Sequence, residues 1–422
     1  MKKIFKSIFL IMLISLIFNF ALECESSDND KWYRVWGGDG QDYCYAIALD
    51  SSNNIYLGGT IEIFGDTQYY ALCLVKYDNA GNYQWNKTID GVSYRGCALT
   101  IDSLNNIYLA GEIYNENSTN FDIILLKFDA SGNYQWNKTW DGGRDDCCYA
   151  IVLDSLDNIY LAGVSASGPN NQDFCLVKYN NLGNYQWNRT WGGSNNDECW
   201  AIALDSSDNI FLAGDTLSFG AGAHDMCLVK YNNTGDFQWY KTWGDSDGQF
   251  CRAIVFDTLE NLYLAGSNYN AGSPDFCLIK YNESGFFQWS RNWGGESFDS
   301  CESILIDPSE HLYLAGTKGD KYSIVVYDTN GSLQWSKSRK IYEGGVGSKI
   351  IRDIDGNNYI GACVNLDKAS NMDFLLIKNL HLLPDQQISG YNIYLFTIMI
   401  GIFLFVIVIK FKHLENKKKY NP

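Results

Sequence analysis

Histidine is scarce in this chain, and its scarcity limits the chemistry that the sequence can support. The four histidines among the 422 residues are scattered in the sequence: His224, His311, His381 and His413. No zinc-binding spacing, nucleophile elbow or phosphate-binding loop accompanies them. The sequence therefore predicts no catalytic residue and no cofactor, and leaves calcium open as a ligand of acidic side chains.

Basic residues are outnumbered as well. Lys and Arg total 32 against 49 Asp and Glu, which gives a formal net charge of -17. Residues 1–23 hold three Lys and one Glu, and residues 410–422 hold five Lys and one Glu; the remainder has 24 basic and 47 acidic residues, or -23. Such a surface repels nucleic acid and attracts divalent cations or basic partners. We therefore expect no nucleic-acid partner.

Long apolar runs are confined to the two ends of the chain. Residues 1–23 join a basic start to an apolar run, which is typical of a secretory signal peptide; an uncleaved anchor is the alternative. Residues 391–409 carry no charge over 19 positions, enough to cross a bilayer as a helix, although a buried core helix is another interpretation.

The charges around these runs predict how the chain is oriented. Five lysines follow the second run within residues 410–422, and positive charge stays on the cytoplasmic side. We therefore expect a type I single-pass cell-membrane protein with a cytoplasmic tail. Residues 31–380 would form the ectodomain, joined to the membrane helix by a linker at 381–390.

Between these ends one segment of about 50 residues repeats. Six tryptophans, each preceded by glutamine, mark the copies at steps of 51, 51, 52, 50 and 46 residues: Trp85, Trp136, Trp187, Trp239, Trp289 and Trp335. Seven aspartates mark a turn in each copy: Asp50, Asp102, Asp154, Asp205, Asp257, Asp307 and Asp353. A fixed period with strand-like pieces indicates a radial or stacked repeat.

Each copy reads as four short antiparallel strands, which is one propeller blade. In the first copy we expect strands at 44–49, 55–60, 71–77 and 83–89, separated by turns rich in Asp, Asn and Gly. Seven turn aspartates predict an all-β, seven-bladed β-propeller. The last copy lacks its fourth strand, so residues 31–36 are expected to pair with residues 373–378 and close the ring.

The repeat resembles the SBBP-type (seven-bladed β-propeller) repeat family. The resemblance rests on the Asp-x-x-x-Asn-Ile-Tyr-Leu-Ala-Gly core, an Asp before the third strand and Lys-Tyr-Asn/Asp-x-x-Gly-x-x-x-Trp, over about residues 31–380. It implies a secreted or surface protein with a propeller fold. The abundant cysteines and the degenerate seventh copy depart from the family's pattern.

Ten of the thirteen cysteines recur at two fixed positions of the repeat. An extracellular location permits disulfides between neighbouring blades, and a constant spacing of 24 residues suggests four pairs: Cys73–Cys97, Cys175–Cys199, Cys227–Cys251 and Cys277–Cys301. The same regularity would arise from buried free thiols held at one position of the repeat. Both interpretations stay open, and Cys147–Cys148 is an additional vicinal pair.

Other repeated side chains are candidates for binding or modification. Five aspartates precede third strands and form a partial ring that could bind calcium, although such residues also bond loop backbone: Asp122, Asp173, Asp225, Asp275 and Asp373. Asparagines in seven Asn-x-Ser/Thr motifs are expected to be glycosylated outside the cell: Asn86, Asn117, Asn137, Asn188, Asn232, Asn282 and Asn330. The strand tryptophans indicate blade packing rather than carbohydrate stacking, with Trp200 a less certain case.

These features predict a binding or adhesion protein on the cell surface that recognises an extracellular protein or glycan. The variable loops between second and third strands would carry recognition, because they can change without altering a strand. Two alternatives remain, a structural component of the cell envelope and a quinoprotein-like extracellular enzyme. The sequence does not name the ligand.

Overall fold

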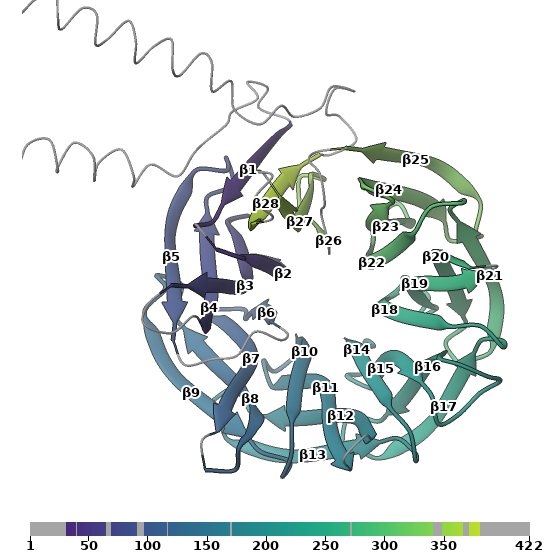
Figure 1. The fold of residues 1–422 in the computed structure, drawn as a ribbon, viewed down its shortest axis with the longest axis horizontal. Coiled ribbons are helices and arrows are strands. Elements are labelled where there is room, and N and C mark those ends of the chain that lie inside the picture. Colours follow the sequence, from purple (N-terminus) through teal and green to yellow (C-terminus); the bar gives the residue numbers. More distant parts are fainter. Residues whose placement is uncertain are drawn as a thin grey trace, which may run out of the picture.

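The structure, a computed structural model, forms a ring of seven four-stranded antiparallel sheets (Figure 1). It describes residues 31–38, 40–64, 69–90, 97–115, 117–168, 171–270, 272–340, 348–365 and 371–379. All regular elements in these ranges are strands, which confirms the predicted all-β, seven-bladed propeller. No helix within them is long and apolar enough to span a bilayer. The predicted signal peptide, linker, membrane helix and tail lie outside the described residues.

The strands of the first four complete blades follow one another in sequence. Blade 1 contains β2 (Tyr43–Leu49), β3 (Ile55–Ile63), β4 (Tyr69–Tyr77) and β5 (Tyr83–Ile89). Blade 2 contains β6 (Ala98–Ile101), β7 (Ile107–Asn115), β8 (Asn120–Phe128) and β9 (Tyr134–Trp140). Blade 3 contains β10 (Asp146–Leu153), β11 (Ile159–Gly168), β12 (Asn171–Tyr179) and β13 (Tyr185–Trp191). Blade 4 contains β14 (Asp197–Leu204), β15 (Ile210–Thr216), β16 (Asp225–Tyr231) and β17 (Phe237–Trp243).

The remaining blades complete the circle. Blade 5 contains β18 (Gln249–Phe256), β19 (Leu262–Asn270), β20 (Ser273–Tyr281) and β21 (Phe287–Trp293). Blade 6 contains β22 (Asp299–Ile306), β23 (His311–Lys318), β24 (Lys321–Asp328) and β25 (Leu333–Arg339). Blade 7 contains β26 (Ser348–Arg352), β27 (Asn358–Asn365), β28 (Met372–Lys378) and β1 (Trp32–Trp36). The first strand of each blade is innermost and the fourth is outermost (Figure 1).

The last blade is closed as predicted. β1 pairs antiparallel with β28 over its whole length, from Trp32 opposite Lys378 to Trp36 opposite Phe374. Trp32 also packs on the turn of the neighbouring blade 1, because a Cβ added to Gly81 would lie 2.6 Å from its ring. β1 therefore completes one blade and contacts the next, and it covers an edge that would otherwise be open.

The repeated aspartate forms the turn between the first two strands. In blade 1, Asp50 Oδ1 accepts hydrogen bonds from the backbone N–H groups of Ser52 and Asn54, each at 2.9 Å. Its Oδ2 accepts a hydrogen bond from the Tyr56 hydroxyl at 3.0 Å, and Asn53 takes the left-handed conformation with φ 61°. The Asp-x-x-x-Asn-Ile-Tyr motif thus encodes a turn and its anchor to the second strand.

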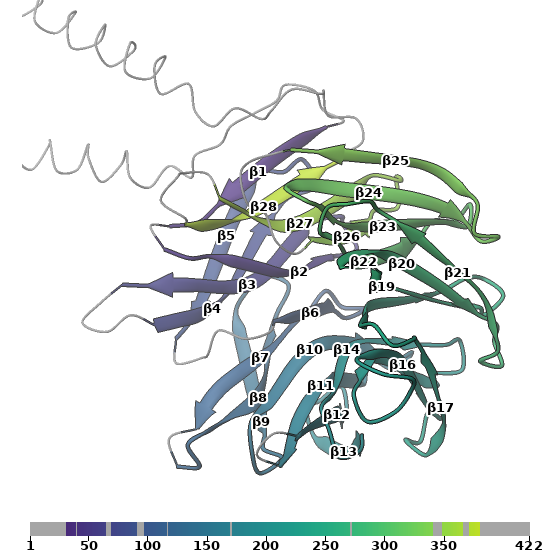
Figure 2. The same cartoon turned by 45° about the vertical axis from the view of Figure 1, so that its right-hand side comes forward.

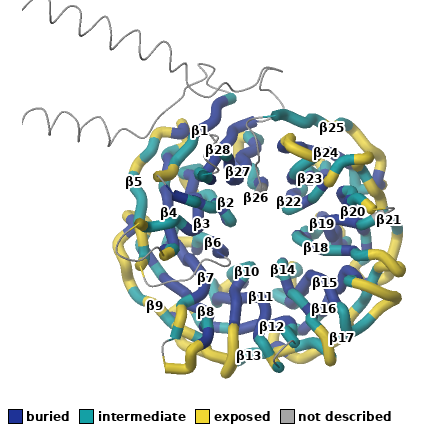
Figure 3. The backbone as a smooth tube through the Cα atoms, in the orientation of Figure 1, coloured by how far each residue is buried: buried dark blue, intermediate teal, exposed yellow. Residues whose placement is uncertain are grey.

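The hydrophobic core is divided among the interfaces between blades. One cluster, for example, joins Tyr108 and Leu125 of blade 2 to Leu161 and Val177 of blade 3. The inner three strands are largely buried, whereas much of the outermost strands is exposed (Figure 3). Each blade thus depends on its neighbours for burial, as expected for a repeat array.

The two ends of the ring differ in structure (Figure 2). We call the end with the second–third loops and the links between blades the loop face, and the end with the tight turns the turn face. The hairpins between second and third strands are longer than predicted in blades 1 and 2. Backbone pairing continues as far as Ile63 opposite Tyr69 in blade 1 and Asn115 opposite Asn120 in blade 2. In blade 4 the connection 217–224 remains a loop.

Candidate functional site

Four of the five aspartates of the predicted ring lie apart, each at the boundary between its own blade and the next. In each boundary the third-strand Asp faces the first residues of the following blade across a glycine. A Cβ added to Gly192, for example, would lie 2.2 Å from Asp173 Oδ1 and 2.8 Å from Asp197 Oδ2. Two of these aspartates accept hydrogen bonds from loop backbone: Asp225 from Ala221 N and Asp275 from Gly295 N, each at 2.9 Å.

The boundary carboxylates together form a band on the loop face that we call the acidic rim: Asp42, Asp122, Asp146, Asp173, Asp197, Asp225, Asp275, Asp299 and Asp373. Burial raises the pKa of Asp42 and of Asp146 to about 6. Burial also raises the pKa of Asp173 and Asp275, and the facing carboxylate of the next blade adds to both. The rim is therefore a region of negative potential, relieved in part at Asp299, where Lys318 Nζ lies 4.0 Å from Oδ2.

Among the described residues, Asp122 alone of the five predicted ligands meets two further acidic side chains. One carboxylate oxygen from each of Asp122, Asp141 and Asp146 lies within 4.8 Å of the others. At Asp173, Asp225, Asp275 and Asp373, no group of three acidic side chains close enough to share one ion is found within the described part of the chain.

A second polar cluster lies on the innermost strands and was not predicted. In five blades the first strand carries a β-bulge two residues before its Ile or equivalent, and the extra residues are Tyr45, Tyr149, Trp200, Arg252 and Glu302. A bulge leaves one residue outside the ladder and re-aims its side chain. Neighbouring bulge residues therefore reach one another across the blades.

We call Tyr149, Trp200, Asp215, His224 and Arg252 the axial cluster. The Tyr149 and Trp200 rings stack at 4.3 Å with 15° between their planes, and the Arg252 guanidinium lies 4.1 Å from the centre of the Trp200 ring. Because Tyr149 comes from the preceding blade and Arg252 from the following one, they enclose Trp200 between them. Trp200 is thus a packing centre, and its role as a stacking platform for carbohydrate is disfavoured.

Asp215 holds the cluster together. It is almost fully buried, and it accepts hydrogen bonds from Trp200 Nε1 at 3.1 Å and His224 Nδ1 at 2.7 Å. Arg252 forms an ion pair with it at 3.4 Å. The hydrogen bond to Asp215 raises the pKa of His224, and burial raises that of nearby Glu198. The cluster thus places a histidine and an arginine beside carboxylates.

The raised pKa of His224 predicts a pH-dependent contribution to stability. Protonated His224 stabilises the folded state fully below about pH 6.5, and this contribution is lost as the pH rises through the higher folded pKa. We expect the wild-type melting temperature to fall relative to that of His224→Gln between pH 6 and 8, by on the order of 1 °C because the ring is partly exposed. Parallel melting profiles of the two proteins across this range would contradict the assignment.

The twelve described cysteines are all buried. Cys148 and Cys175 lie in one row of blade 3, each opposite Gly163 of the strand between them, and the same row recurs around Gly59, Gly214 and Gly266. Third-strand cysteines therefore share a sheet row with the first-strand cysteine of their own blade. Burial raises the pKa of Cys148 to about 12. Disulfides between neighbouring blades stay a prediction.

None of the seven predicted glycosylation sites is buried. Asn117, Asn137 and Asn330 are exposed, and the other four are partly exposed. Asn86 and Asn188 accept hydrogen bonds from tyrosines of their own outermost strands, at 2.6 Å each. Modification at these positions stays a prediction.

Comparisons with known proteins identify the fold without a family. No protein-family model matches the chain, so membership of the SBBP-type repeat family stays a prediction. The "Uncharacterized WD repeat-containing protein L264" of Acanthamoeba polyphaga mimivirus is 22% identical over 194 residues, covering 41% of this chain and 12% of that protein. The match thus spans a small part of that relative's length.

Two solved structures are similar over most of the chain. The WD40 domain of Neurospora crassa Pan2 has a TM-score of 0.53 at 10% identity, covering 86% of this chain and 100% of that one. An ulvan lyase of polysaccharide lyase family PL25, bound to -[GlcA(1-4)Rha3S]-, has a TM-score of 0.51 at 9% identity, covering 84% and 95%. At these identities the likeness shows the propeller fold alone, which a WD40 domain and a polysaccharide lyase share.

Proposed function

We propose that this protein is a binding module of the cell surface whose loop face captures a basic protein partner. The observation that carries the proposal is the acidic loop face, where the nine rim carboxylates, most of them buried, lie in the same boundary segments as exposed acids such as Asp247 and Glu296. Burial raises the pKa of several rim carboxyl groups, because it disfavours their charged form. A cation placed nearby would stabilise that charged form. Lysine and arginine side chains of a partner would provide such cations, and the net charge of the chain would steer the encounter.

The two faces differ in how freely they can serve recognition. On the turn face the carboxylates are engaged in structure: Asp154 caps its own turn, and Asp157 accepts a hydrogen bond from Ser103 of the preceding blade at 2.6 Å. The loop face carries exposed acidic residues in addition to the rim, including Asp245, Asp247 and Glu296. Recognition at the loop face therefore leaves the turns undisturbed.

The proposed attachment to a membrane fits this use of the loop face. The last described residue, Asn379, donates its N–H to Asn358 O at 2.8 Å, next to the turn of blade 7. Residues 380–390 can extend at most about 40 Å. A membrane helix at 391–409 would therefore hold the turn face toward the bilayer and direct the loop face away from it.

Charge removal on one face tests the proposal. We expect Asp247→Asn/Glu296→Gln to weaken binding of a Lys/Arg-rich peptide about fivefold in low salt, because each exposed charge contributes modestly. The matched control is Glu283→Gln/Asp355→Asn, which removes the same charge from exposed positions near the turns. Binding of the full-length protein would be measured by biolayer interferometry at 50 and 300 mM salt. Equal losses in both variants, or salt-independent binding, would contradict the proposal.

An extracellular enzyme is the second candidate, favoured by one observation. His224 and Asp215 form a hydrogen-bonded pair beside Arg252, an arrangement that can move a proton when a substrate is present. Turnover of a polysaccharide by the wild-type chain, lost in His224→Gln, would establish this alternative over the binding module.

A further inference from the structure

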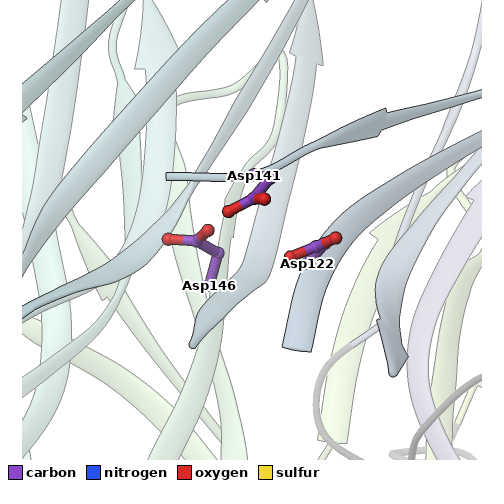
Figure 4. Close-up of side chains that lie close together, drawn as sticks. All are labelled: Asp122, Asp141 and Asp146. Atoms are coloured by element: carbon purple, nitrogen blue, oxygen red, sulfur yellow. The ribbon is translucent and has the colours of Figure 1, made fainter. Parts of the chain in front are cut away.

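Three carboxylates converge where blade 2 passes into blade 3 (Figure 4). Asp122 lies on β8, Asp141 follows the end of β9, and Asp146 begins β10. The three side chains thus come from three segments of chain on the loop face, and one oxygen from each lies within 4.8 Å of the others. Asp141 is exposed, so solvent and ions can reach the group.

The two inner carboxylates each have one oxygen without a well-placed hydrogen-bond donor. Asp122 is 4% exposed and Asp146 is fully buried, and Oδ1 of each accepts no hydrogen bond of normal geometry, although the Ser165 hydroxyl lies close enough to Asp146 to lower its pKa. Their other oxygens are held in place: Asp122 Oδ2 accepts from Asn115 Nδ2 at 2.8 Å, and Asp146 Oδ2 accepts from Gly142 N at 2.6 Å. A buried carboxylate oxygen without a well-placed donor is costly, so these two atoms are suited to bind a cation.

No basic side chain in the described part of the chain forms an ion pair with these three carboxylates. Elsewhere buried aspartates have such partners, as Asp215 has Arg252 and His224. Asp299, another rim residue, has Lys318 at 4.0 Å. The charge at Asp122, Asp141 and Asp146 is therefore not neutralised by the protein.

Asp141 stands at a repeat position that also carries an acid in blade 1, as Asp90, and a lysine in blade 6, as Lys340. The same position after the outermost strand is glycine at four other boundaries: Gly37, Gly192, Gly244 and Gly294. There the third-strand carboxylate fills the space, and a Cβ at Gly294 would lie 1.9 Å from Asp275 Oδ1. At Asp122 the hydrogen bond to Asn115 draws that carboxylate away, which leaves room for the third acid. The boundaries with glycine are thus internal controls with two carboxylates or fewer.

We propose that Asp122, Asp141 and Asp146 bind one divalent cation, Ca²⁺. All three protein ligands are carboxylate oxygens, which suit hard cations, and water would complete the coordination shell. A site with one exposed ligand and three carboxylates fits the affinity of extracellular modules, with a Kd on the order of 0.1–1 mM. The ion would also tie blade 2 to blade 3. This inference does not depend on the proposed partner.

Titration of the purified full-length chain with CaCl₂ tests the site. Isothermal titration calorimetry should show one site per chain, and 10 mM Ca²⁺ should raise the melting temperature by about 2–4 °C. Asp141→Gly, which restores the repeat residue, should abolish both effects while melting as the wild type does in EDTA. Asp247→Asn, an exposed acid at another boundary, should retain both.

Each remaining outcome overturns the proposal. If 10 mM Ca²⁺ produced neither binding heat nor a shift in melting temperature, a calcium site with the proposed Kd would be excluded. An equal shift in Asp141→Gly would place the ion elsewhere, and binding of Mg²⁺ in preference to Ca²⁺ would exclude the assigned cation. Asp141→Asn serves as a second variant, since it keeps the side-chain volume and removes only the charge.

Discussion

Deletion of residues 24–38 should lower the melting temperature of the chain by about 10 °C or more. The deletion removes β1, whose five residues pair with β28, and uncovers the edge of that strand. It also exposes the apolar surface that Trp32 and Tyr33 bury, at 3% and 5% exposure. Losing one such side chain typically costs about 3–5 kcal/mol, and an opened ring loses the contact between its first and last blades as well.

A point variant separates packing from loss of the strand. Trp32 contacts Tyr359 of its own blade at 6.1 Å between rings and the Gly81 turn of blade 1, where Arg34 Nε also donates to Gly81 O at 2.8 Å. We expect Trp32→Ala to destabilise the protein by about 3–5 kcal/mol. Tyr134→Ala, at a half-exposed aromatic of another outermost strand, is the control and should cost much less. Circular dichroism melts of the three proteins measure both effects, and an unchanged melt of the deletion would refute closure by β1.

The closure and the blade count could be predicted because the signals are local. The seven turn aspartates each hydrogen-bond within five residues along the chain or to the next strand, so every copy carries its own evidence. The fourth strand missing from the last copy matched the extra strand at the amino-terminal end. The hairpin lengths of blades 1 and 2 were underestimated, because backbone pairing continues through residues without clear alternation.

The axial cluster and the three-carboxylate site could not be predicted in the same way. Both are made by neighbouring blades, and the contacts depend on how the sheets pack rather than on a pattern within one copy. Signals were nevertheless present in the sequence. Trp200 stood out as a substitution beside a repeated cysteine, and Asp141 replaces a glycine that recurs at other boundaries. The sequence does not show in which direction each side chain points. For Trp200 that direction is set by the β-bulge between Cys199 and Ala201.

Replacement of the glycine opposite a bulge should also lower the stability of the fold strongly. Gly214 on β15 pairs with Cys199, the residue just before the bulge at Trp200. A Cβ at Gly214 would lie 1.9 Å from the carbonyl oxygen of Glu198 and 2.9 Å from Cys199 Cα. Both obstacles are backbone atoms of the neighbouring strand, so no change of rotamer can remove the clash, and the two strands have to separate.

We therefore expect Gly214→Ala to destabilise the protein by about 3–5 kcal/mol, in the range of severe backbone and packing defects. Separation of β14 from β15 would also displace Trp200 from between Tyr149 and Arg252, so the near-ultraviolet circular dichroism should lose intensity even below the melting transition. Gly168→Ala is the matched control, because a Cβ there would sit 3.5 Å from its nearest neighbour, in ordinary contact. If Gly214→Ala melted like the control and kept the aromatic signal, the bulge would not have the tight geometry that holds Trp200 in the axial cluster.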